Sequence, residues 1–276
     1  MTKTAIIAGT GVLPGILADR LDETNTPYVI AELEGFAMEN PKGRPVERFI
    51  VERLALLFDR FDDLGVEQVI FAGAVSRPAI DPERIDPKTA TLLPVLLPAF
   101  QQGDDALLRA VIALFEDAGF SVVGVDSVAP ELVPGEGVLT TAQPSQDDKA
   151  DADRAAKVVA GIGALDVGQG AVVAQGLCLA IETLPGTAAM LRWVAEVAKT
   201  CRANPNGAKG VFFKAPKPGQ ERRIDLPAIG PDTVVQADAA DLAGIVIEAG
   251  GVMLLDPEAT IAEANSRGLF IWARTP

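Results

Sequence analysis

The stretch TAIIAGTGVLPG, residues 4–15, decides the fold of the first half of this chain. Its opening residues, Thr4 to Ala8, form a short apolar run that is typical of a buried strand. Glycines follow at once, and Pro14 suits the first turn of a helix. A strand, a glycine-rich turn and a helix in this order predict a βα unit.

The same alternation of strand and helix continues over the first half of the sequence. PYVIAEL, EQVIFAG and FSVVGVD predict further strands, and GDDALLRAVIALFEDAG predicts a helix that ends at Gly119. A second helix is predicted where apolar residues recur at helical spacing from Phe49 to Leu64. Such alternation indicates a parallel sheet covered on both faces. We therefore expect a Rossmann-like N-terminal domain over residues 1–130.

The second half of the chain differs from the first in composition and in the order of its predicted elements. Residues 131–147 are rich in Pro, Gly, Ser and Thr, which predicts a linker. Residues 148–276 then mix helical segments with strands, and AVVAQG followed by LCLAIE resembles a hairpin. The expected fold class is therefore α/β, with the Rossmann-like N-terminal domain joined to a mixed α/β C-terminal domain.

Composition removes several classes of function. The 276 residues include no histidine, which excludes Ser-His-Asp triads, histidine bases and the usual zinc sites. A metal would have to be a hard ion held by oxygen ligands, which favours Mg2+ or Mn2+. The net charge of −14 is a poor match for nucleic acid. Cys178 and Cys201 lack CxxC spacing and suit buried free thiols in a reducing cytoplasm.

Two glycine-containing turns in the first half are candidate ligand sites. The turn GTGVLPG could present backbone amides to a phosphate at a helix start, but it reads GxGxxxG, and such a turn needs no ligand to exist. FAGAVSRP follows a predicted strand at the edge where open α/β sheets bind ligands, although it could equally be a plain turn before Pro78. The candidate substrate-binding residues of these turns are Gly9, Thr10, Gly11, Leu13, Gly73, Ser76 and Arg77.

Other candidates are individually weaker. Asp104 and Asp105 could hold a metal, but a helix cap and dipole compensation explain the pair as well. Gln169 and Gln175 lie in the glycine-rich stretch DVGQGAVVAQG, and Thr187 lies at a predicted helix start, where free amides can meet an anion. Hairpin glycines and ordinary helix caps account for these features equally well.

The stretch KAPKPGQERRIDLPAIG, residues 214–230, has an unusual charge pattern. From Lys209 to Arg223 there are five cationic residues and one acidic residue in an otherwise acidic chain. Lys214, Lys217 and Arg223 could converge on a pyrophosphate, and Asp225 could hold a divalent cation or orient a water. A solvated basic loop is the competing interpretation.

Several stretches together resemble one family, and they run in order along nearly the whole chain. They are IAGTGVLPGILA, FAGAVSRP, GDDALLRAV, LDVGQGAVVAQGLCLAIE, GTAAMLRWVA, KAPKPGQERRIDLPAIG and LAGIVIEAG. The sequence is similar to the UDP-2,3-diacylglucosamine pyrophosphatases of bacterial lipid A synthesis, in their histidine-poor, magnesium-dependent, two-domain form. The motifs around Gln169 and Asp225 are the most distinctive. One departure is Thr10, where a glycine is expected in relatives.

The resemblance implies a specific reaction. Water attacks the α-phosphorus of UDP-2,3-diacylglucosamine, which gives UMP and 2,3-diacylglucosamine 1-phosphate. The family's essential aspartate corresponds to Asp225, which is also a candidate metal ligand, and the substrate is expected between the two domains. The resemblance further implies a homodimer, a cytoplasmic location and transient contact with the inner membrane, with no nucleic-acid partner. A non-catalytic protein that senses nucleotide-sugars or lipids is the alternative from another class.

Overall fold

The computed structural model describes residues 2–100 and 104–275, with the side chains of Phe100 and Asp104 left out. The chain forms two compact units, and each unit combines two separate segments of the sequence. The first unit is Met1–Pro130 together with Arg223–Asp225, and the second is Glu131–Arg222 together with Leu226–Pro276. Three residues from late in the sequence therefore belong to the first unit.

The first unit contains a five-stranded, fully parallel sheet. Its strands lie in the order β3 (Glu47–Phe49), β2 (Tyr28–Leu33), β1 (Thr4–Ala8), β4 (Gln68–Ala72) and β5 (Ser121–Val123). Every residue of β1 is buried, as expected of a central strand covered on both faces. The order 3-2-1-4-5 is the start of the doubly wound arrangement, so the predicted Rossmann-like sheet is confirmed.

Helices cover both faces of this sheet. They are α1 (Leu13–Glu23), α2 (Leu54–Leu64), α3 (Pro87–Ala90), α4 (Leu93–Phe100) and α5 (Asp104–Asp117). α1 packs on β1 and β2, whereas α2 and α5 share a phenylalanine-rich core with Ala5 and Ile7 of β1. In that core the rings of Phe58 and Phe115 meet edge to face, with centroids 4.9 Å apart. We call this cluster the phenylalanine core.

The start of one predicted helix differs from the structure. Phe49 was expected to begin a helix, but it ends the edge strand β3, and α2 starts at Leu54 after a short 3-10 turn, η1 (Val51–Arg53). Phe49 still packs against the phenylalanine core, so its apolar side chain faces the interior as its spacing indicated. A three-residue strand is too short to show the alternation that distinguishes a strand from a helix.

The second unit is built on a mixed six-stranded sheet. The order is β6 (Gly137–Val138), β13 (Phe270–Arg274), β11 (Gly244–Glu248), β9 (Val211–Lys214), β7 (Gly170–Ala174) and β8 (Leu177–Ile181). The central strands β13, β11 and β9 are parallel, and β7, β8 and β6 join in antiparallel pairs. The predicted hairpin is thus β7 and β8. Cys178 on β8 is exposed, as is Cys201, so the prediction that these thiols are buried was wrong. A small separate sheet pairs β10 (Ala228–Ile229) with β12 (Met253–Leu254).

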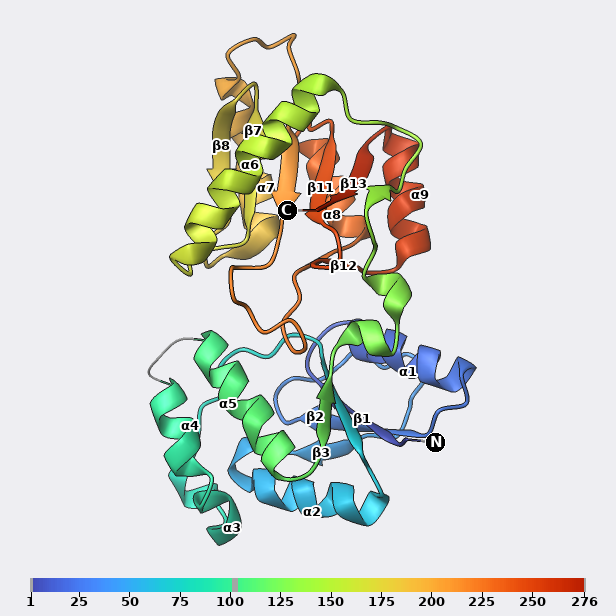
Figure 1. The fold of residues 1–276 in the computed structure, drawn as a ribbon, viewed down its shortest axis with the longest axis vertical. Coiled ribbons are helices and arrows are strands. Elements are labelled where there is room, and N and C mark those ends of the chain that lie inside the picture. Colours follow the sequence, from blue (N-terminus) through green and yellow to red (C-terminus); the bar gives the residue numbers. More distant parts are fainter. Residues whose placement is uncertain (1, 101–103, 276) are drawn as a thin grey trace. The chain divides into compact units, whose positions relative to one another are not determined.

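Four longer helices accompany this sheet. α6 (Gln146–Ala164) packs on β7 and β9, and α7 (Gly186–Glu196), α8 (Pro231–Ala239) and α9 (Pro257–Arg267) contribute to a different core cluster (Figure 1). The stretch 131–147 differs from the expected linker, because it supplies strand β6 and the Ser145 cap of α6. A two-residue strand leaves no periodicity in a Pro- and Gly-rich sequence, so composition alone could not reveal it. Within the described ranges, no helix combines the length and apolarity needed to cross a bilayer.

Candidate active site

Two candidate loops of the first unit are joined directly by hydrogen bonds. The backbone N–H of Thr10 donates to the carbonyl of Ala74 at 2.9 Å, and the N–H of Ala74 donates back to the carbonyl of Thr10 at 3.0 Å. The Thr10 hydroxyl also donates to the carbonyl of Ala74, at 3.0 Å. The loops follow β1 and β4, whose last residues, Ala8 and Ala72, are paired. They therefore meet at the carboxyl edge of the sheet, where the strand order reverses and doubly wound folds bind ligands.

Glycines make this junction possible. A Cβ on Gly9 would lie 2.6 Å from the carbonyl oxygen of Ala74, and a Cβ on Gly73 would lie 2.6 Å from that of Thr10. Gly73 also has φ +91°, a conformation that residues with a side chain rarely adopt. The close approach of the two backbones therefore explains why both loops contain glycine.

The other candidates on these loops differ in accessibility. Ser76 and Arg77 are exposed, as a ligand contact would require. Gly11 has φ +96°, and its carbonyl accepts a hydrogen bond from Glu39 N–H. Leu13 is only 8% exposed, so its side chain belongs to the interior and only the backbone at the start of α1 is positioned for a ligand.

A second cluster lies in the other unit, where three sequence segments meet. The ammonium of Lys214, at the end of β9, donates to the Thr187 hydroxyl at 2.6 Å, and that hydroxyl donates to Glu182 Oε2 at 3.0 Å. Lys214 and Glu182 also form an ion pair at 3.6 Å, with side-chain exposures of 6% and 10%. The structure thus brings together two predicted residues, Thr187 and Lys214. Glu182, the last residue of the stretch LCLAIE, is their shared partner.

The DVGQG motif is explained by the same cluster. A Cβ on Gly168 would lie 2.0 Å from the carbonyl oxygen of Glu182, and a Cβ on Gly170 would lie 2.6 Å from its Oε2. Both glycines therefore leave room for Glu182 at the end of β8. Between them, the carbonyl of Gln169 accepts a hydrogen bond from Ala215 N–H, which links the start of β7 to the basic stretch. The side-chain Oε1 of Gln169 is buried and has no hydrogen-bond partner among the described residues.

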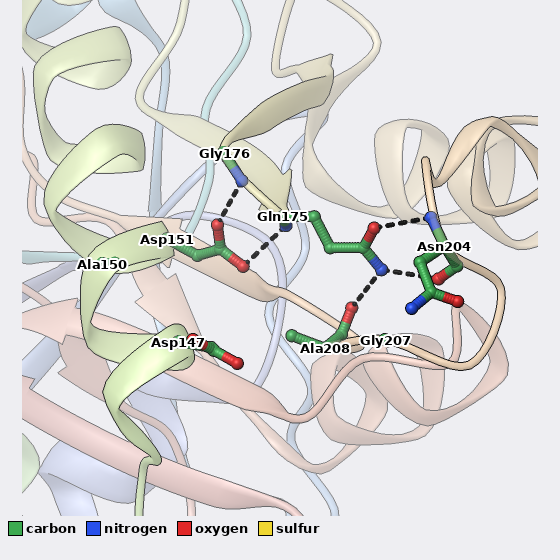
Figure 2. A pocket seen from close by; sticks show the side chains of 8 residues that line it. All are labelled: Asp147, Ala150, Asp151, Gln175, Gly176, Asn204, Gly207 and Ala208. Atoms are coloured by element: carbon green, nitrogen blue, oxygen red, sulfur yellow. Dashed lines mark hydrogen bonds between the residues drawn. The ribbon is translucent and has the colours of Figure 1, made fainter.

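Gln175 lies at the opposite end of β7, in the β7–β8 turn, and its side chain is engaged elsewhere. Its amide accepts from Asn204 N–H at 2.8 Å and donates to the carbonyls of Asn204 and Ala208 (Figure 2). Asp151, which is 2% exposed, accepts from the backbone N–H groups of Gln175 and Gly176. The residues that make these contacts line a pocket of about 340 Å³, and the contacts hold the loop after α7. The structure does not bring Gln175 together with Lys214 and Thr187.

Each cation of the basic stretch has an acidic partner. The pairs are Lys209–Asp241, Lys214–Glu182, Lys217–Asp166, Arg222–Glu248 and Arg223–Glu116. Burial raises the pKa of Asp241, but hydrogen bonding and charge from Lys209 outweigh this, and its pKa lies below the ordinary value. The net positive charge seen in the sequence is therefore neutralised locally. Lys214 is the member of this set whose ion pair is buried on both sides, so its ammonium is the least hydrated of the five.

Comparison with known proteins identifies the family. Residues 3–132 match the model of the LpxI N-terminal domain, and residues 135–272 match that of the LpxI C-terminal domain. The chain is 41% identical over 276 residues to a Caulobacter vibrioides protein named UDP-2,3-diacylglucosamine pyrophosphatase LpxI, covering 100% of this chain and 99% of that one. This chain belongs to the LpxI family.

A solved structure, the CobK precorrin-6A reductase, aligns with the whole LpxI-family chain and 90% of its own at 16% identity, with a TM-score of 0.30. That score is too low to bear on fold or function. The two LpxI models meet between residues 132 and 135, next to the boundary between the structural units. The exception is Arg223–Asp225, which lies in the stretch matched by the C-terminal model but belongs to the first unit.

Where the structure describes them, the acidic side chains named as possible magnesium ligands of this LpxI-family chain do not form a cluster. Asp105 pairs with Arg109 at 2.8 Å, and the side chain of Asp104 lies outside the described residues. In the described parts of the chain, no group of three or more Asp, Glu or Cys side chains could hold a metal. Magnesium is commonly held by one or two carboxylates and by substrate phosphates, so a single protein carboxylate would suffice for the expected ion. Asp225 is the candidate protein ligand.

Asp126 is a neighbour of the Asp225 segment that sequence reasoning missed. Its Oδ1 would lie 2.4 Å from a Cβ on Gly124, and the Cα of Arg223 would lie 3.6 Å from that same position. The carboxylate is exposed and follows β5 at the carboxyl edge of the sheet. Its position after a strand, in FSVVGVD, was the available signal. Without knowledge that Arg223 returns to this unit, the residue had no apparent partner.

Proposed function

We propose that this chain hydrolyses the pyrophosphate of UDP-2,3-diacylglucosamine. The observation that carries the proposal is the 41% identity, over essentially full length on both sides, to the Caulobacter vibrioides protein named for that activity. The proposed products are UMP and 2,3-diacylglucosamine 1-phosphate. Water oxygen bonds to the α-phosphorus, and the bond between that phosphorus and the bridging oxygen breaks.

The proposed roles follow from the chemistry of the named groups. Asp225 orients the attacking water and accepts its proton, a task that carboxylates perform and that needs no histidine. The backbone amides and hydroxyls of the joined Thr10 and Ala74 loops contact the nucleotide, as such loops do at the carboxyl edge of doubly wound sheets. Asp225 and the substrate phosphates would hold magnesium, which would neutralise the negative charge on the phosphate oxygens.

Lys214 and Thr187 are proposed to contact phosphate oxygens. A buried ammonium that is held by Thr187 and Glu182 is preorganised, and it acts more strongly on a nearby anion than a hydrated lysine does. Lys217 and Arg223, the other cations proposed to bind substrate, already hold acidic partners and would have to exchange them for a phosphate. Gln169, whose buried side-chain oxygen has no partner among the described residues, remains a candidate for substrate binding. The contacts of the Gln175 side chain instead support a role in holding the loop after α7.

The direct assay is release of UMP from UDP-2,3-diacylglucosamine by the purified chain. We expect turnover with Mg2+ and its loss on addition of excess EDTA, because charge neutralisation at phosphorus depends on the cation. Restoration by Mg2+ or Mn2+ is the control for damage by the chelator. Binding of the UDP-sugar without turnover under either divalent metal would instead support the non-catalytic sensing protein.

We infer that two copies of the chain associate through β8. This strand is at the edge of its sheet, its five residues LCLAI carry no charge or proline, and Leu177 and Ile181 are 47% and 37% exposed. Natural edge strands are usually protected by charge or proline, so an apolar edge favours pairing with another strand. Ile181→Lys should shift sedimentation from dimer to monomer; a wild-type monomer at micromolar concentration would contradict the proposal.

We further propose a cytoplasmic protein that touches the inner membrane transiently to reach its lipid substrate. Val95 and Leu97 of α4 are 46% and 53% exposed and offer apolar surface to acyl chains. Leu96 of the same helix is nevertheless buried, so part of α4 is interior. Co-sedimentation with vesicles that contain the diacyl sugar nucleotide tests this contact; equal loss of binding is expected for Val95→Ser and Leu97→Ser, and no binding by the wild type would refute it.

A further inference from the structure

The segment Arg223–Asp225 is separated in structure from its flanking sequence. Residues up to Arg222 and from Leu226 onward belong to the second unit, while these three residues belong to the first. The chain therefore crosses into the first unit and returns within a very short stretch. Such an excursion persists only if contacts hold it, since it gains no support from a helix or a strand.

The contacts of this segment with the first unit are apolar and ionic. Ile224 is partly buried and packs against the phenylalanine core. The Arg223 guanidinium pairs with Glu116 of α5 at 2.7 Å. The Arg223 backbone also passes close to Gly124, where a Cβ would lie 3.6 Å from the Arg223 Cα.

The residues just before the segment are held by the other unit. Lys217 donates to Asp166 at 2.6 Å, and Arg222 donates to Glu248 at 2.7 Å. Two adjacent arginines thus bind carboxylates of different units. Arg222 ends the part of the loop fixed to the second unit, and Ile224 provides the apolar contact that fixes the next residues to the first.

We propose that Ile224 is a positioning residue that places Asp225 on the first unit, the unit that carries the Thr10 and Ala74 loops. The inference rests on the proposed function, and it adds that the RRID sequence is an anchor as well as a source of charge. Ile224 is the residue immediately before Asp225, so its packing fixes the backbone from which the carboxylate extends. Removal of that packing takes away the apolar contact that holds the backbone next to Asp225.

The expected effect falls on turnover rather than on substrate binding. A carboxylate that acts on a water must be held within a narrow range of positions, and a displacement of about 1 Å can lower the rate about 100-fold. Substrate contacts elsewhere are unchanged, so KM should change little. A residue with only a structural role would lower stability without this selective loss of kcat.

The test compares Ile224→Ala with Val111→Ala. Val111 lies on α5 and is also a partly buried residue packed against the phenylalanine core, but it is remote in sequence from Asp225. We expect Ile224→Ala to lower kcat by about 10- to 100-fold with KM within about twofold. Val111→Ala should lower the unfolding temperature by a similar amount and leave kcat within about twofold. Ile224→Val, which keeps most of the packing, should restore most of the lost turnover.

Each result decides a different question. A kcat for Ile224→Ala equal to that of Val111→Ala would overturn the positioning role. If Ile224→Ala does not fold, Ile224→Thr takes its place, because the hydroxyl weakens the apolar packing; a normal kcat with a lowered unfolding temperature in that variant would overturn the role equally. A wild-type protein that binds the UDP-sugar but releases no UMP would instead refute the proposed function. That outcome differs from equal kcat values in the two variants, so the two failures can be told apart.

Discussion

Replacing Asp225 with alanine is expected to lower kcat by at least about 1,000-fold, because general-base groups contribute roughly 100- to 10,000-fold and this one is proposed also to hold the metal. Asp225 is partly buried and lies outside the helices and sheets, so replacing its side chain should leave the fold intact. Release of UMP measures the loss, and thermal unfolding checks the fold.

Asp62→Ala is a suitable control for that experiment. Asp62 is an exposed carboxylate on α2 of the same unit, and its removal changes the net charge equally. Surface substitutions of this kind typically alter stability by less than about 0.5 kcal/mol, so activity should stay at the wild-type level. Near-normal turnover by Asp225→Ala would remove that residue from the mechanism.

Gly73→Ala is expected to have the second large effect, on both stability and activity. The added Cβ would lie 2.6 Å from the carbonyl oxygen of Thr10, and the backbone at φ +91° disfavours any side chain. Forcing the loops apart should cost about 1–3 kcal/mol in addition to the strain of about 1 kcal/mol from φ alone. If the joined loops bind nucleotide, kcat/KM should fall by about 100-fold.

Gly119→Ala separates these two causes. Gly119 has φ +97°, and a Cβ there would meet nothing within 4 Å. It therefore reports the backbone strain without the steric contact, and it lies away from the loops, after α5. Chemical denaturation should show the larger loss of unfolding free energy for Gly73→Ala. Equal losses in the two variants would mean that the junction of the loops is not as tight as the distances indicate.

Local sequence patterns predicted the sheets well because the information was local. Strands such as β1 are short apolar runs followed by glycine, and such uninterrupted apolar runs are typical of strands that are buried on both faces. The turns after β1 and β4 were likewise expected at one edge of the sheet. Short elements were missed, as β6 and β3 show, since two or three residues carry no periodicity.

Pairings over long sequence distances could not be predicted. The sequence left the basic stretch open between a pyrophosphate site and a solvated loop, and it gave no sign that these cations meet carboxylates as remote as Glu116. Lys214 and Thr187 were each named as candidates, yet only the structure shows that Glu182 joins them. The return of Ile224 to the first unit is likewise invisible in sequence, where a single apolar residue between charges carries no structural signal.

The measurement that tests the central claim most directly is hydrolysis of UDP-2,3-diacylglucosamine by the wild-type chain with Mg2+ in oxygen-18 water. Attack on the α-phosphorus bonds the water oxygen to the phosphorus that leaves in UMP. Mass spectrometry of the products is therefore expected to find one heavy oxygen in UMP and none in 2,3-diacylglucosamine 1-phosphate. Label in the sugar phosphate, or no release of UMP at all, would contradict the account.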